Sequence, residues 1–306
     1  MSDRRVLRMG RCLAMGACAA GLALVSSMGL AGPRYVIAAP GSTAEWTKKL
    51  GVDELWVGCS SEPDRCMKSL DFYARANGVN RVTLSISSDP KLIADYALRY
   101  SEASLSEPRL RAIVLDDFVS ALIHWQQAGV TPGPLVRQVV ANVKNKNPKL
   151  QFGLTLYENE MNFAVLKDDV FPLATRARVD RVSLFVHFRK NGLQYASYVP
   201  QAKKLFPNAV IVAGVYAYDR SDYMPCAEGG KEKCTRAQDL ALFEQTLRVQ
   251  VGMMDAGQVA GIQFWPGTFG SEEAWAGWDS PGVCSERQEC VKTTLAMHDA
   301  VLKALR

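Results

Sequence analysis

The sequence has few of the residues that metal, nucleotide and nucleic-acid sites require. It contains only three histidines in 306 residues, with no His-x-His pair and no Cys-x-x-Cys pair, so zinc ligands are scarce. No glycine-rich phosphate turn follows an early predicted strand, which argues against a doubly wound nucleotide-binding fold. No basic stripe with interleaved aromatic residues is present, so nucleic acid is not expected as a partner. We expect no metal and no cofactor.

The first 31 residues have the pattern of a signal peptide. Four arginines (Arg4, Arg5, Arg8 and Arg11) precede an apolar stretch over residues 12–30, and small residues follow at 29–31. A membrane anchor is the alternative, but the apolar stretch is short and weakly hydrophobic. We therefore predict a signal peptide over 1–31 and a mature domain over 32–306. The mature chain is expected in the periplasm or secreted, with no stable membrane insertion after cleavage.

The cysteines agree with export. Two of the eight lie in the predicted signal peptide, and the others form three close pairs: Cys59 with Cys66, Cys226 with Cys234, and Cys284 with Cys290. An even number of cysteines in an exported chain indicates disulfides. We predict three local bridges, each of which closes a short loop.

The rest of the chain alternates between strand and helix patterns. Strands are predicted at 35–39, 54–59, 81–87, 111–118, 150–158, 181–187, 210–218 and 261–266. Helices are predicted at 44–50, 66–77, 91–102, 120–145, 162–176, 236–255 and 290–305, and one more helix follows the sixth strand and ends at 205. Eight βα units over roughly 270 residues match the size of a TIM barrel. The sequence thus predicts the α/β class and a single (β/α)8 TIM-barrel domain with local disulfides in its loops.

Side chains alternate between the two faces of a strand, so each strand has one phase that faces the barrel interior. On each strand, the aliphatic set of alternate residues is expected to pack against the helices. The other set then faces the barrel interior, and near the carboxyl ends of the strands it is polar and aromatic. That inward set comprises Trp56, Ser87, Asp116, Tyr157, His187, Tyr216, Tyr218, Gln263 and Trp265, with Asp117, Glu158 and Asp219 at the rim. Aromatic faces stack on sugars while acids and amides bind hydroxyls, so the set predicts a carbohydrate site.

Each of these residues also has a purely structural interpretation. Asp117 stands where a helix N-cap is expected, and Glu158 has an outward phase that suits a cap equally well. Tyr157, Tyr216 and Trp265 could be core aromatics. The functional interpretation depends on their convergence at one end of one barrel.

Three short segments resemble the chitinase-like group of TIM-barrel glycoside hydrolases. They are Asp116-Asp117-Phe118 at the end of the fourth strand, Gly214-Val-Tyr-Ala-Tyr218 in the seventh and Gly261-Ile-Gln-Phe-Trp265 in the eighth. The chain departs from that group in having no glutamate at the position of the usual acid, and Ala112 and Val114 upstream of Asp116. The resemblance implies a barrel that binds a glycan at the carboxyl ends of its strands.

We therefore predict an exported glycoside hydrolase that acts on a polysaccharide or glycan. Glycosidases need one carboxylic acid and a second nucleophilic or basic group. Asp117 is the predicted acid, with Asp116 to orient it, and Asp219 or Glu158 is the second carboxylate. The alternatives are an inactive carbohydrate-binding barrel and, last, a metal-dependent hydrolase or deacetylase using Asp116, Asp117 and His187.

Overall fold

The eight predicted strands form one closed parallel barrel. The computed structural model describes residues 35–38, 44–59, 61–222, 224–265 and 287–306. The chain divides into the units Met1–Leu30 and Ala31–Arg306, and the predicted signal peptide lies outside the described residues. Strands β1 to β8 pair in sequence order, and β8 closes on β1. The predicted (β/α)8 TIM barrel is confirmed.

Each strand lies close to its predicted position. The bounds are β1 Val36–Ala38, β2 Glu54–Val57, β3 Val82–Ser85, β4 Leu110–Leu115, β5 Gln151–Tyr157, β6 Arg181–Phe185, β7 Val210–Tyr216 and β8 Gly261–Trp265. The α-helices are α1 Ala44–Leu50, α2 Pro63–Asn77, α3 Ile93–Ser106, α4 Phe118–Gln127, α5 Pro132–Lys146, α6 Leu173–Arg176, α7 Tyr195–Leu205, α8 Arg236–Asp255 and α10 Arg287–Leu305. Short 3-10 helices are η1 Glu158–Glu160, η2 Ala164–Leu166 and η3 Arg189–Gln194.

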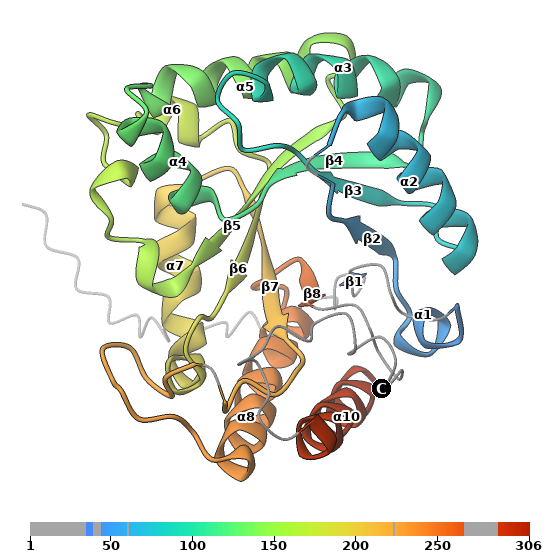
Figure 1. Ribbon diagram of the computed structural model, residues 1–306, viewed down its shortest axis with the longest axis vertical. Coiled ribbons are helices and arrows are strands. Elements are labelled where there is room, and N and C mark those ends of the chain that lie inside the picture. Colours follow the sequence, from blue (N-terminus) through green and yellow to red (C-terminus); the bar gives the residue numbers. More distant parts are fainter. Residues whose placement is uncertain (1–34, 39–43, 60, 223, 266–286) are drawn as a thin grey trace, which may run out of the picture. The chain divides into compact units, whose positions relative to one another are not determined.

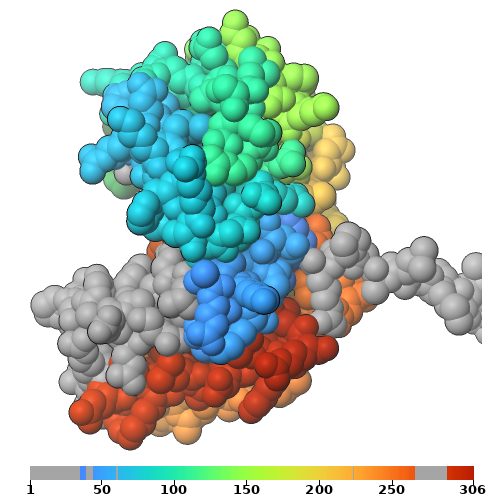
Figure 2. Space-filling model, turned by 90° about the vertical axis from the view of Figure 1, so that its right-hand side faces the viewer, coloured from blue at the N-terminus to red at the C-terminus, as the bar shows by residue number. Residues whose placement is uncertain are grey.

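The helices pack on the outside of the strands. Figure 1 shows α3 beside α5 at one side of the barrel and α8 beside α10 at another, and both pairs are in contact. Figure 2 shows α1, in blue, between α2 above it and α10, in red, below it. The helix that precedes β2 therefore contacts the last helix of the chain, as expected for a closed ring. No helix in the described ranges is long and apolar enough to cross a membrane.

Two predicted helices differ from those observed. The helix predicted over 120–145 is two helices, α4 and α5, because Gly129 has a positive φ of 76° and Pro132 starts a new helix. The helix predicted over 162–176 is wrong: that segment contains only η2 and the single-turn α6. Pro172 at the N-cap of α6 limits regular helix to the last four residues of the segment.

The two faces of the barrel have different cores. The large cluster between strands and helices contains aliphatic residues of one phase, such as Leu84, Leu154 and Leu184. A separate small cluster inside the barrel contains Ile37, Trp56 and Val212, with Tyr35 and Trp265 packed against it. The inward phase inferred from the alternation therefore agrees with the packing.

The strand registers place the inward-facing residues in layers. Even-numbered and odd-numbered strands supply alternate layers. From the amino to the carboxyl ends these are Glu54, Ala112, Arg181 and Gly261; Ile37, Thr83, Gly153 and Val212; Trp56, Val114, Ser183 and Gln263; Ser85, Thr155 and Gly214; Asp116, Phe185 and Trp265; and Ser87, Tyr157 and Tyr216. Gly214 is required because a Cβ there would meet the Phe185 ring. The upper two layers thus bring the predicted acid and aromatic residues together.

A buried ion pair closes the amino-terminal end of the barrel. The Arg181 guanidinium Nη1 lies 2.5 Å from Glu54 Oε1, and both side chains are almost fully buried. The hydroxyls of Thr83 and Tyr35 also donate to the Glu54 carboxylate, and Gln151 Oε1 accepts from Arg181 at 3.0 Å. Because every charged atom finds partners, this cluster can exist without solvent.

Two of the three predicted disulfides are present. Cys59 bonds to Cys66 with their Cα atoms 5.7 Å apart, and Cys226 bonds to Cys234 with Cα atoms 4.8 Å apart. The first links the end of β2 to α2, and the second closes the loop that leads from β7 to α8. Cys284 lies outside the described residues, so its bond to Cys290 stays a prediction.

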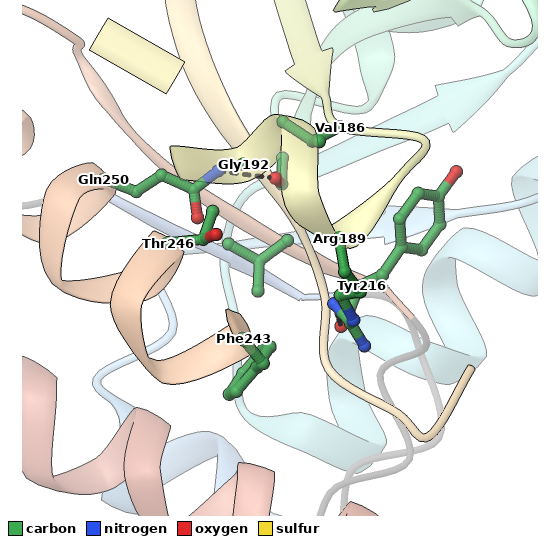
Figure 3. A pocket seen from close by; sticks show the side chains of 9 residues that line it. Val186, Arg189, Gly192, Tyr216, Phe243, Thr246 and Gln250 are labelled. Carbon is green, nitrogen blue, oxygen red and sulfur yellow. Dashed lines mark hydrogen bonds between the residues drawn. The ribbon is translucent and has the colours of Figure 1, made fainter. Parts of the chain in front are cut away.

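A small cavity lies between β7, η3 and α8 (Figure 3). Its volume of about 20 Å³ is enough for one water molecule. Gln250 Nε2 donates to the Gly214 carbonyl at 2.9 Å on one side, and Gly192 and Thr246 approach each other on another. A Cβ on Gly192 would clash with the Thr246 side chain.

We expect Gly192→Ala to lower the free energy of unfolding by about 1–3 kcal/mol, the usual cost of overpacking a filled site. Urea denaturation at neutral pH measures this. Gly252→Ala in α8 is the matched control, because nothing lies within 4 Å of the added methyl and alanine favours the helix. Equal stability of the two variants would show that the Thr246 side chain moves aside without lowering the free energy of unfolding.

Candidate functional site

The Asp pair occupies the turn between β4 and α4. Asp117 has φ 45° and ψ 49° and is the one non-glycine residue with positive φ among those the structure describes. It stands at the N-cap of α4, yet its side chain makes no capping hydrogen bond. The left-handed conformation is uncommon outside glycine, although aspartate adopts it more readily than most residues. The helix-cap interpretation therefore does not explain Asp117.

The Asp117 carboxylate instead joins a chain of hydroxyl groups. Tyr157 at the end of β5 donates its phenol hydrogen to Asp117 Oδ1 at 2.9 Å. Tyr216 at the end of β7 donates to the Tyr157 oxygen at 2.8 Å. Burial raises the pKa of both phenols, so both stay protonated at neutral pH. This chain fixes the direction in which the Asp117 carboxylate points.

Asp116 faces the barrel interior, as its strand phase predicts. Its Oδ1 accepts a hydrogen bond from the Asp117 backbone N–H at 3.0 Å. Burial, followed by the negative charge of Asp117, raises the pKa of Asp116 to about 6, and the Thr155 hydroxyl partly offsets that rise. Asp116 is therefore the carboxyl of the pair that holds a proton in weak acid.

Two polar atoms beneath Asp116 have no hydrogen-bond partner among the described residues. They are Ser85 Oγ, in the layer directly below, and Trp56 Nε1, in the layer under that. Both side chains are more than nine-tenths buried. Unpaired buried polar atoms are uncommon in proteins and cost about 1–3 kcal/mol each. Their presence shows that the barrel interior below the acid is polar and not simply a hydrophobic plug.

The predicted aromatic residues contact one another in pairs, and not all of them are exposed. Trp56 and Trp265 pack edge to face with ring centroids 5.1 Å apart. The Tyr157 ring lies 5.2 Å from His187, and the Tyr216 ring lies 5.9 Å from that of Tyr218, which is buried. Gln263, in the same layer as Trp56, is buried and accepts a hydrogen bond from Ser183 at 2.6 Å.

The two carboxylates considered as the second catalytic group bind the protein itself. Glu158 is 7% exposed and accepts hydrogen bonds from the backbone of His187 at 2.7 Å and Phe188 at 3.2 Å, and from Asn191 at 3.0 Å. Asp219 accepts from the backbone and hydroxyl of Ser221. Both carboxylates hold loops that leave the barrel mouth.

Sequence reasoning missed three charged residues around the site. Glu160 is buried, accepts from the Tyr157 backbone N–H at 3.0 Å, and has its pKa raised to about 7, mainly by burial. The Arg220 guanidinium lies 4.5 Å from the Tyr216 ring centroid. Arg189 donates to the carbonyls of Tyr216 and Tyr218 at 2.9 and 2.6 Å. No local motif marks these residues, because their partners come from distant segments.

A groove leads outward from the Asp pair. It encloses about 570 Å³ between the loop that follows β3 and the start of α4, and both Asp116 and Asp117 line it. This volume is within the range of small-molecule sites. In the described part of the chain, no group of three or more His, Cys, Asp or Glu residues could hold a metal ion.

Comparisons with known proteins reveal similarity of structure only. No protein-family model and no curated protein sequence matches the chain. The fold is similar to a GH18 chitinase from Pseudoalteromonas aurantia at 12% identity, with a TM-score of 0.50 over 85% of this chain and 100% of the other. It is equally similar to a GH113 beta-1,4-mannanase at 10% identity, with a TM-score of 0.50 over 87% and 98% of the two chains. The resemblance to TIM-barrel glycoside hydrolases inferred from the sequence is therefore confirmed as a likeness of fold.

Proposed function

We propose that this protein is an exported glycoside hydrolase that cleaves a polysaccharide or glycan at the Asp116–Asp117 end of its barrel. The observation that carries the proposal is the conformation of Asp117. Its side chain makes no capping hydrogen bond to the helix that follows and instead accepts one from the Tyr157 hydroxyl. The glycosidase-like barrel and its glycan-active structural neighbours support the same reaction class.

Asp116 is the proton donor in this proposal. The sequence suggested Asp117 for that role, but burial raises the pKa of Asp116 to about 6, and a glycosidase acid must carry a proton near its working pH. The proton passes from Asp116 to the oxygen of the leaving sugar as the glycosidic bond breaks. Water then adds to the anomeric carbon and gives its proton to the Asp116 carboxylate, which completes the hydrolysis and restores the acid.

Asp117 is the negatively charged partner. A carboxylate beside the sugar ring stabilises the positive charge that develops there in the transition state. Tyr157 and Tyr216 hold this carboxylate in one orientation, and Trp265 and His187 shape the mouth around the sugar. Trp56, Tyr218 and Gln263 are buried and support the residues of the mouth. Glu158 and Asp219 serve as anchors of the loops after β6 and β7, because their oxygens already accept hydrogen bonds.

Export fits the disulfide-bonded loops. Disulfides persist in oxidising compartments, and two are present in the described residues. We therefore propose that residues 1–31 are removed and that the mature chain acts in the periplasm or outside the cell.

A panel of soluble glycans tests the proposal. Reducing-sugar release from at least one member is expected for the wild-type chain. The hydrogen bonds that Glu158 and Asp219 Oδ1 accept from the protein itself favour a second candidate, a barrel that binds glycans without cleaving them. A glycan that raises the melting temperature of the protein but releases no reducing sugar would support this second candidate over the first.

We expect Tyr157→Phe to lower kcat about 10- to 100-fold, because the carboxylate of Asp117 loses the donor that orients it. KM should change less than kcat. Tyr96→Phe is the matched control, since it removes another tyrosine–carboxylate hydrogen bond, to Glu62 on the outside of the barrel. If both variants keep wild-type turnover, the hydroxyl chain has no part in the reaction.

A further inference from the structure

The groove beside the Asp pair extends beyond the proposed point of cleavage. One wall is the loop over residues 87–90 that follows β3, and the other is the face of α4 that carries Ser120, His124 and Ala128. These three positions span about 12 Å along the helix axis. We call this feature the α4 groove. It has room for more than the sugar unit whose bond breaks.

The loop wall of the α4 groove is held in place by hydrogen bonds. The indole Nε1–H of Trp125, from α4, donates to the Ser88 carbonyl at 2.6 Å. The backbone N–H of Asp89 donates to Ser87 Oγ at 3.2 Å, and the backbone N–H of Lys91 donates to Asp89 Oδ1 at 2.9 Å. The wall is therefore organised before any ligand binds, which reduces the entropy that binding would cost.

The residues that line the α4 groove determine what it can accept. Hydroxyl and imidazole groups of Ser87, Ser120 and His124 offer hydrogen bonds. Three carboxyl groups, those of Asp89, Asp116 and Asp117, face the same space, and no lysine or arginine is among the lining residues. This arrangement repels anions, because like charges cost energy when they approach in a partly enclosed site.

We propose that the α4 groove binds the continuation of a saccharide chain that carries hydroxyl or amino groups and no acid groups. The protein then acts within neutral or amine-bearing chains, and uronic-acid, sulfated and phosphorylated chains are excluded. This inference rests on the glycan recognition proposed above, and it adds the chemical class of the substrate and the place where its extended part lies.

Binding to the full disulfide-bonded chain tests the inference without relying on cleavage. Three tetrasaccharide probes are titrated by calorimetry at low salt: a glucosamine chain, its N-acetylated form and a galacturonate chain. We expect the first two to bind, and the galacturonate chain to bind at least tenfold more weakly. Equal or tighter binding of the galacturonate chain, or binding of none of the three, would overturn the inference.

Blocking variants locate the binding. Ser120→Trp and Ala128→Trp place a large ring at the inner and outer parts of the α4 groove and should each weaken binding at least tenfold. Ser197→Trp, at an exposed serine of α7, is the control and should bind as the wild type does. Unchanged affinity in both groove variants, with melting curves like that of the wild type, would show that the saccharide binds elsewhere on the protein.

Reducing-sugar release is measured on the same probes, so the two proposals fail separately. Groove-dependent binding with no cleavage of any probe contradicts the hydrolase proposal and leaves the inference intact. Cleavage that neither groove variant changes contradicts the inference and leaves the hydrolase proposal intact.

Discussion

Asp116→Asn is expected to lower glycan hydrolysis by two to four decades while making the protein more stable at pH 7. The amide keeps the shape of the side chain but cannot donate the proton that the leaving oxygen requires, and a positioned general acid contributes about 10²- to 10⁴-fold. The stability gain has a separate cause. The wild-type carboxyl must ionise in a largely desolvated position beside Asp117, whereas the amide carries no charge.

The sign of the pH dependence follows from the raised pKa. Asp116 has a pKa of about 6 in the folded chain, against 3.8 for an aspartate free in water. Between these values the folded state keeps a proton that the unfolded state has lost, so stability falls as pH rises from about 4 to about 6. Asp116→Asn removes that loss. Because the side chain retains some contact with solvent, we expect a gain of about 1–2 kcal/mol at pH 7 and little at pH 4.

Turnover and denaturant unfolding of the variant are measured at both pH values. Asp169→Asn, an isosteric change at an exposed loop aspartate, is the control and should alter neither quantity. If Asp116→Asn keeps wild-type turnover, this carboxyl does not take part in the reaction. A pH-independent stability difference would show that the carboxyl is not desolvated.

Arg181→Met is expected to destabilise the fold by about 3–5 kcal/mol, the cost of leaving a buried charge without its partner. The Glu54 carboxylate would keep the hydroxyl donors from Thr83 and Tyr35 and the partly exposed Arg81, whose Nε lies 3.9 Å away, but would lose its only buried cation in the described residues. The double variant Glu54→Leu/Arg181→Met should recover much of the loss, since it removes both charges from the barrel interior.

Urea unfolding measures both variants. Lys49→Met is the control, because it breaks an ion pair with Glu45 whose two side chains are largely exposed, and exposed pairs are worth about 0–1 kcal/mol. If Arg181→Met lowers the free energy of unfolding no more than Lys49→Met does, water reaches the Glu54 carboxylate and the ion-pair cluster is hydrated.

The sequence alone was enough to predict the barrel and the neighbourhood of the site. Alternation of short apolar runs with helix patterns has few solutions at this length, and the eight-stranded barrel is the one observed. The two-residue period then determined which side chains turn inward, and it put Asp116, Tyr157 and Tyr216 near one another at the mouth. Close spacing was also enough to pair Cys59 with Cys66 and Cys226 with Cys234.

Only the tertiary structure decided what each polar group does. Glu158 looks like a free acid in the sequence, but its oxygens accept hydrogen bonds from His187, Phe188 and Asn191, whose approach depends on the whole fold. Glu54 and Arg181 are 127 positions apart and meet because shear in the closed barrel sets them in one layer. The protonation of Asp116 likewise depends on burial, which no local pattern encodes. Periodicity specifies the direction of a side chain, whereas its partners and its pKa follow from contacts that exist only after the barrel closes.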